Sequence, residues 1–307
     1  MITSLINSIT LMGILMIIGF NLRNKKILND DAENALTYIL VNIAIPAMLV
    51  NSFLVDFSVE QLKTGLTLLM VAVFFDLFLI LLGNVVAIKL KDKDKKKIVK
   101  FTVALMNGAF MGYPIVNQMF GAEGLFYATM FHTPNIIFMW TYGTSLFLDG
   151  KKDKKRYVQM FVNPGMVGVY IGLIIYLSRI QLPPFAINLV GLMANVTTVL
   201  SMIIIGSKIA TIGIHNSFFD IQAYFASCWR LIISPIIMII ILKFLNFEEM
   251  IEQIYVIYAA LPVAVMMPIM AKSYGNGDDG FASKIVVITH LLSLVTIPLF
   301  VWLYTIM

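Results

Sequence analysis

Long apolar segments alternate with short polar stretches along almost the whole chain. Ten of these segments approach or exceed the roughly 20 residues that an α-helix needs to cross the hydrocarbon core of a bilayer. The pattern predicts an all-α polytopic membrane protein with ten transmembrane helices and no separate soluble domain. The predicted spans are residues 3–22, 36–55, 65–88, 98–120, 124–148, 161–180, 185–209, 221–245, 251–274 and 284–305.

The basic residues gather in three of the polar stretches, after the first, third and fifth spans. Cytoplasmic loops of membrane proteins are enriched in Lys and Arg, so we assign these stretches to the cytoplasmic side. The chain is then a multi-pass protein of the cytoplasmic membrane with both termini on the extracytoplasmic side. The three cytoplasmic stretches hold fifteen of the 22 basic residues: Arg23, Lys25, Lys26, Lys89, Lys91, Lys93, Lys95, Lys96, Lys97, Lys100, Lys151, Lys152, Lys154, Lys155 and Arg156.

The composition agrees with this class. The chain is 60% hydrophobic and 13% charged, whereas soluble domains carry roughly a quarter charged residues. The net charge of +5 comes from the loops and does not indicate a nucleic-acid partner. Cys228 is the single cysteine, which excludes a disulfide framework and a thiolate metal site. The expected surroundings are the lipid bilayer, and the sequence leaves a homodimer open.

Two of the apolar segments are interrupted by residues that break helices, at 106–121 and at 261–275. Pro114 and Pro268 start the same pattern, in which an isoleucine follows the proline and an aromatic-glycine pair comes six residues after it. The interruptions fall in the fourth and ninth spans. We therefore predict an inverted repeat of five plus five helices, residues 1–150 and 151–307, in which broken helices 4 and 9 cross. Paired interrupted helices indicate a binding site near the membrane midplane.

A broken helix offers chemistry without a charged side chain. A helix that restarts at Pro114, or at Pro262 or Pro268, would present free N–H groups and the positive end of its dipole, which together suit an anion. The alternative is a proline kink that serves packing alone. The residues that we expect to bind substrate are Asn107, Gly108, Tyr113, Pro114, Asn117, Pro262 and Lys272.

Asp76 is an acidic residue near the centre of the third span. A carboxylate there costs at least about 2.5 kcal/mol to insert, so it should face the protein interior. We expect Asp76 to carry a coupling proton; a structural hydrogen bond to a neighbouring helix is the alternative.

Several other polar residues lie within the spans. Arg230 and Lys272 are candidates for contact with an anion, and the alternative for both, as for Lys208, is snorkelling to the inner interface. The three histidines, His132, His215 and His290, do not have the spacing of metal ligands, and no nucleophile–base set is evident. We therefore predict no metal, no cofactor and no enzymatic activity. The residues expected to border a cavity are Asn42, Asn51, His132, Asn195 and Arg230.

The order of these features resembles the auxin efflux carrier family, which groups plant auxin exporters with bacterial permeases for malate, malonate and related acids. The stretch from Asn107 to Pro114 is similar to the family's Asn-x-Gly-Phe-x-Gly-x-Pro crossover, with the first glycine displaced. Further similar segments are Ile45-Pro46-Ala47, Asn51-Ser52-Phe53, Asn163-Pro164, Ile205-Gly206-Ser207-Lys208, Arg230 with Pro235, Leu261-Pro262, Ala271-Lys272-Ser273-Tyr274-Gly275 and the stretch from Ser293 to Pro298.

The resemblance implies an inverted-repeat fold, alternating access and a substrate that bears a carboxylate, such as malate or a related dicarboxylate. We therefore expect a secondary active transporter of a small organic anion, with a proton or sodium as the coupling ion. A cation/proton exchanger with the same crossover is the alternative. A passive channel also remains open.

Overall fold

The computed structural model of the chain describes residues 2–148, 158, 161–213, 217, 220–245, 247–274 and 277–307. Within these ranges every regular element is a helix, which confirms the all-α class. The predicted repeat boundary at residue 150, the basic loop 151–156, His215 and Gly275 lie outside the described residues.

Helices form over each of the ten apolar segments. In chain order the elements are α1 (Ile2–Asn24), α2 (Asp30–Ile39), η1 (Leu40–Ala44), α3 (Ile45–Ser52), α4 (Val59–Ala87), α5 (Lys93–Ala104), η2 (Gly108–Gly112), α6 (Tyr113–Phe138), η3 (Met139–Gly143), α8 (Pro164–Ser178), α9 (Pro184–Ile212), α11 (Ile221–Cys228), η4 (Trp229–Ile233), α12 (Ser234–Leu242), α13 (Glu249–Ala259), α14 (Met266–Tyr274) and α15 (Asp279–Thr305). The elements labelled η are π-helical turns.

By length and composition, six of the described helical stretches can cross a membrane. They are Ile2–Asn24, Asp30–Ser52, Val59–Ala87, Pro184–Ile212, Ile221–Leu242 and Asp279–Thr305. Helices α5, α13 and α14 are shorter because the chain leaves the helical conformation after α5 and again between α13 and α14. Helix α8 has only 15 residues. Ten spans in a five-plus-five inverted repeat therefore stay a prediction.

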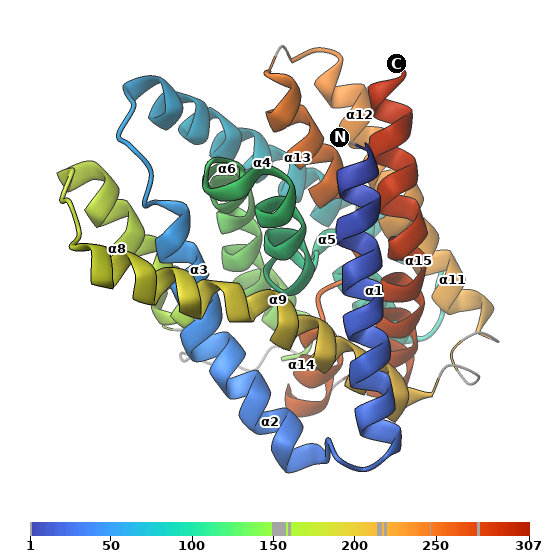
Figure 1. Ribbon diagram of the computed structural model, residues 1–307. Coiled ribbons are helices and arrows are strands. Elements are labelled where there is room, and N and C mark those ends of the chain that lie inside the picture. The colour runs from blue at the N-terminus through green and yellow to red at the C-terminus, as the bar shows by residue number, and fades with distance from the viewer. Residues whose placement is uncertain are drawn as a thin grey trace.

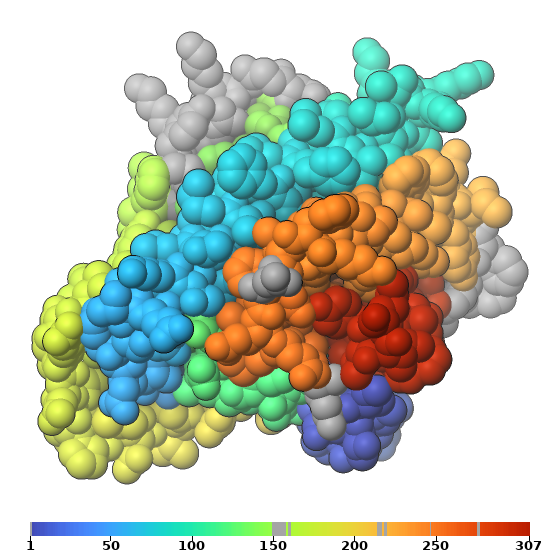
Figure 2. Space-filling model, turned by 90° about the horizontal axis from the view of Figure 1, so that it is seen from above, coloured from blue at the N-terminus to red at the C-terminus, as the bar shows by residue number. Residues whose placement is uncertain are grey.

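The helices pack in two groups. In the first, α9 packs against α1, α2 and α3, and α8 packs against α3. The second contains α4, α5, α6 and α11 to α15, with α13 lying between α4 and α15 when seen from above (Figure 2). The start of α1 and the end of α15 lie at the same end of the molecule (Figure 1). The groups meet where α1 contacts α15 and where α3 contacts α6.

Two glycines let α1 and α9 approach closely. A Cβ atom placed on Gly206 would lie 2.0 Å from the carbonyl oxygen of Met16, and one placed on Gly19 would lie 2.1 Å from that of Ile203. Each glycine thus faces the backbone of the opposite helix. Small residues at such contacts are the usual means of tight helix packing in membranes.

Prolines explain three of the four described π-helical turns. Pro46, Pro114 and Pro235 each stand two residues after the end of such a turn. A proline in a helix lacks an N–H donor, and its ring clashes with the carbonyl group four residues earlier. In all three cases that carbonyl belongs to the π-helical turn, whose wider hydrogen-bond ring relieves the clash. These prolines therefore widen the helix without breaking it.

We expect Gly206→Ala to destabilise the protein by about 1–3 kcal/mol or more, because the new methyl group would overlap the backbone of α1. The matched control is Gly191→Ala on the same helix, where a Cβ atom meets no atom within 4 Å. Thermal melting of the purified variants in detergent measures the difference. Equal melting temperatures would contradict the close contact.

Candidate functional site

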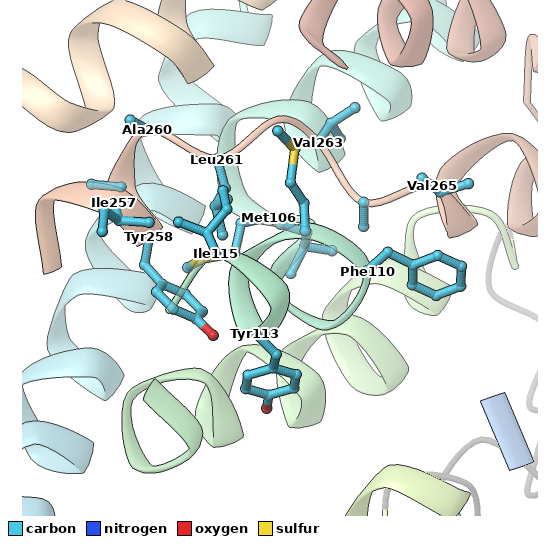
Figure 3. Close-up of a cluster of buried hydrophobic side chains, with 14 of the residues drawn as sticks. Met106, Phe110, Tyr113, Ile115, Ile257, Tyr258, Ala260, Leu261, Val263 and Val265 are labelled. Carbon is cyan, nitrogen blue, oxygen red and sulfur yellow. The ribbon is translucent and has the colours of Figure 1, made fainter. Parts of the chain in front are cut away.

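The two interrupted helices cross one another as extended chain. Beyond the ends of α5 and α13, Met106 and Val263 form an isolated antiparallel bridge. The N–H of Asn107 donates to the carbonyl of Pro262 (2.9 Å), and the N–H of Ala264 donates to that of Leu105 (3.2 Å). The prediction that the two breaks lie against each other is confirmed. Figure 3 shows the segment through Leu261 and Val263 passing across the turn that carries Met106 and Phe110.

The crossing is enclosed by apolar side chains. Tyr258 at the end of α13 and Leu261 and Val263 beyond it are buried, as are Met106 and, at the start of α6, Ile115 (Figure 3). Because these positions are buried, the backbone groups that leave the helices need protein partners. The pairing across the crossing supplies part of these partners.

One helix resumes at Gly108, in η2, which is six residues before Pro114. The other resumes at Met266, between Pro262 and Pro268. The predicted restarts at Pro114 and Pro262 are wrong, whereas Pro268 lies in the first turn of α14. Pro114 sits in the second turn because the π-helical turn before it tolerates its missing donor, whereas Pro262 belongs to the extended crossing itself.

Arg230 donates hydrogen bonds to the carbonyl groups at the helix ends beside the crossing. Its guanidinium donates to the carbonyls of Leu261 (2.8 Å), Ala259 (2.9 Å), Tyr258 (3.1 Å) and Val103 (3.4 Å). These carbonyls lie at or next to the C-terminal ends of α13 and α5, where no intrahelical donor is available. The side chain is fully buried, which excludes snorkelling to an interface. A cation at two C-terminal helix ends also offsets their negative dipole charge.

A small cavity of about 110 Å³ lies beside the crossing, between the two groups of helices. Three helices begin at its wall: η2 at Gly108, α8 at Pro164 and α14 at Met266. Among the described residues that line it, none is Asp, Glu, Lys or Arg. The lining residues are Val41, Ile45, Leu49, Met106, Asn107, Ala109, Phe110, Tyr113, His132, Asn135, Ile136, Met139, Trp140, Asn163, Pro164, Gly165, Ala264, Val265 and Met266.

Neutral polar side chains complete the wall of the cavity. The side-chain nitrogen of Asn107 lies 2.8 Å from Nε2 of His290, and Nδ1 of His132 lies 3.0 Å from the hydroxyl of Tyr113. The His132 ring also covers Gly108, where a Cβ atom would lie 2.3 Å from the ring. Only glycine therefore fits at this helix start while His132 keeps its position.

Asp76 lies behind the cavity wall and faces the protein interior, as predicted. Its Oδ1 accepts a hydrogen bond from Nδ2 of Asn135 (2.9 Å), whereas its buried Oδ2 has no partner among the described residues. Asn135 also contacts the crossing, since its Nδ2 lies 3.3 Å from the carbonyl of Ala104 and its Oδ1 lies 3.4 Å from the N–H of Met106. One amide thus connects the acid to the backbone break.

The structure gathers only part of the predicted site. Asn107, Gly108, Tyr113, Pro262 and His132 meet at the crossing and the cavity, and Pro114 lies one turn further on. Arg230 holds the crossing from the side of the helix ends and does not line the cavity. The remaining predicted residues also lie outside the cavity lining: Asn117 and Asn51 are half-buried, and Lys272, Asn42 and Asn195 are exposed.

Three contributors were not predicted as site residues. Asn135 follows His132 by three residues, a spacing that places both on one helix face and is the signal that could have found it. Asn163 caps the start of α8, and Pro164 occupies its first turn, but nothing in the sequence places this helix start beside residue 108. The contact of His290 with Asn107 joins residues 183 positions apart.

Comparisons with known proteins agree with this architecture. The chain matches the protein family described as membrane transport protein over residues 5–160 and 153–301. It is 25% identical to an uncharacterized transporter of Methanothermobacter thermautotrophicus, over 93% of this chain and 94% of the relative. It is 24% identical to an uncharacterized transporter of Methanocaldococcus jannaschii, over 94% of this chain and 96% of the relative.

We expect Arg230→Met to lower stability by about 3 kcal/mol or more, because it leaves several buried carbonyl groups without donors. The matched control is Lys243→Met, which removes an exposed cation near the end of α12. Melting temperatures in detergent compare the two. Similar melting of both variants would show that Arg230 does not hold the crossing together.

Proposed function

Because this chain belongs to the membrane transport protein family, we propose that it is a secondary active transporter that moves a small organic anion across the cytoplasmic membrane by alternating access. The expected cargo is a carboxylate, with malate or a related dicarboxylate as the first candidates. This is the family of auxin efflux carriers that the sequence motifs resemble.

The observation that carries the anion proposal is the meeting of three helix starts at one cavity. Pro164 and Pro268 carry no N–H, and the N–H groups of Met166 and Met267 already donate to Asn163 and Ala264. The other N–H groups at the starts of η2, α8 and α14 have no acceptor at the preceding turn of their own helices. Helix starts attract anions through these donors and through their dipoles. With no charged side chain among the described lining residues, the backbone is the main source of positive potential.

The size of the cavity favours a small cargo. A water molecule occupies roughly 30 Å³ in the liquid, so a space of about 110 Å³ corresponds to three or four waters. A short carboxylic acid is of this order. Larger acids would need the two groups of helices to separate.

The position of the cavity supports alternating access. Its walls come from both groups, with Ile45 and Pro164 on one side and Asn107, His132 and Met266 on the other. Movement of one group against the other would open the cavity to either side of the membrane. Transporters with broken helices at the midplane commonly work in this way.

Asp76 is the proposed carrier of a coupling proton. Its Oδ2 is buried and has no hydrogen-bond partner among the described residues, so this oxygen is available to hold a proton. Asn135 links Asp76 to the backbone of the crossing, so a change in the charge of Asp76 would alter the hydrogen bonds at the crossing.

Uptake by the purified protein in liposomes, with a panel of mono- and dicarboxylates and imposed proton or sodium gradients, tests the proposal. We expect uptake of at least one acid and accelerated exchange when that acid is present inside. Ala109→Asp should abolish this uptake, because it places a carboxylate at the helix start in the cavity. Ala109→Asn, which has nearly the same shape without the charge, should retain most of it.

Equal uptake by the two Ala109 variants would count against an anion site at the helix starts. Transport of sodium or protons without any acid would favour the cation/proton exchanger. Uptake of an acid without accelerated exchange would indicate a channel.

We expect Asp76→Asn to fold and to transport, but to lose its dependence on an imposed proton gradient, because the amide cannot release a proton. Initial uptake rates with and without an inward proton gradient measure this, with wild-type protein as the reference. A variant that still responds to the gradient as wild type does would remove Asp76 from coupling.

A further inference from the structure

His290 holds the cavity-lining Asn107 in one orientation. The Nδ1 atom of His290 lies 2.7 Å from the carbonyl oxygen of Val286, which can only accept, so Nδ1 carries the proton. In the neutral ring Nε2 is then an acceptor. It lies 2.8 Å from the side-chain nitrogen of Asn107, which therefore donates to it. His290 is fully buried and Asn107 nearly so.

The backbone of Asn107 is held as firmly as its amide. Its N–H donates to Pro262 across the crossing, and its carbonyl accepts from the N–H groups of Met111 and Gly112. An amide rotated by 180° would bring its oxygen against the bare Nε2 of His290, and two acceptors repel. The side chain therefore has one favourable orientation in the described structure.

This orientation leaves an acceptor, Oδ1 of Asn107, beside the N–H donors of the helix starts. Oδ1 of Asn107 makes no hydrogen bond with the described residues, and it is not among the fully buried polar atoms that lack a partner. Since Asn107 lines the cavity, Oδ1 is accessible from there. The helix starts beside it offer N–H groups. A carboxylate alone matches the N–H groups and leaves Oδ1 unmatched.

We infer that His290 is a positioning residue that fixes Asn107 so that the cavity selects a carboxylate bearing a hydroxyl group or another hydrogen-bond donor. This inference rests on the proposed transport of organic anions and adds a requirement on the cargo. An acid without a donor would bury Oδ1 with no partner, and burial of an unsatisfied acceptor weakens binding by roughly tenfold or more.

Pairs of acids that differ by one hydroxyl test the inference: lactate against propionate, and malate against succinate. Each acid competes with uptake of the best transported acid in liposomes, and the ratio of the two inhibition constants is the readout. In wild type we expect the hydroxy acid to bind about tenfold or more tightly in at least one pair. His290→Phe should bring that ratio close to one, because the Asn107 amide becomes free to rotate.

His290→Gln is the matched variant, since its side-chain oxygen can still accept from Asn107, and it should keep most of the preference. Asn107→Leu is a second route to the same readout: it removes Oδ1 and should lose the preference even if His290→Phe does not fold. Thermal melting identifies folded variants.

A wild type that transports acids without a hydroxyl preference would overturn the inference and leave the proposed function intact. A preference for the hydroxy acid that survives both His290→Phe and Asn107→Leu would also overturn the inference and leave the proposed function intact. Failure to transport any acid would overturn the proposed function, and the inference with it.

Discussion

A helix that stops inside a membrane leaves carbonyl groups without donors, and no water can replace them. The protein meets this constraint at one point, where α5 and α13 end. Arg230 donates to four carbonyl groups there, and the strands beyond the helix ends pair with each other. The rest of the site depends on this arrangement, because satisfied ends allow the following helices to begin in the interior.

The same arrangement separates charge within the crossing. The negative ends of two helices face a buried guanidinium, and the positive ends of three helices face the cavity. Asp76 stands behind the wall, and its side chain reaches the crossing through Asn135. In the proposed transporter, the helix starts would attract the anion although the lining is neutral, and Asp76 would influence the cavity without direct contact with the cargo.

Sequence patterns predicted the parts of this site that are local. Apolar length predicted the helices, prolines and glycines predicted the interruptions, and the cost of a charge in lipid predicted that Asp76 faces inward. The patterns failed where the conformation or role of a residue depends on a contact with a residue far away in the sequence. The restart at Gly108 depends on a π-helical turn and on His132 above the glycine, and Arg230 could not be assigned without the helix ends that it contacts. Asn42 and Asn195 show the reverse case: polar residues in apolar spans that lie exposed, away from the cavity.

The neutral lining of the cavity has an electrical consequence. Moving one elementary charge through a membrane potential requires about 2.3 kcal/mol per 100 mV. The lining adds no charged side chain to the moving site, so in the proposed cycle the charge that crosses is the sum of the anion and any proton carried by Asp76. A membrane potential would then distinguish acids by this sum: a monocarboxylate that moves with one proton would not respond to it, whereas a dicarboxylate that moves with one proton would.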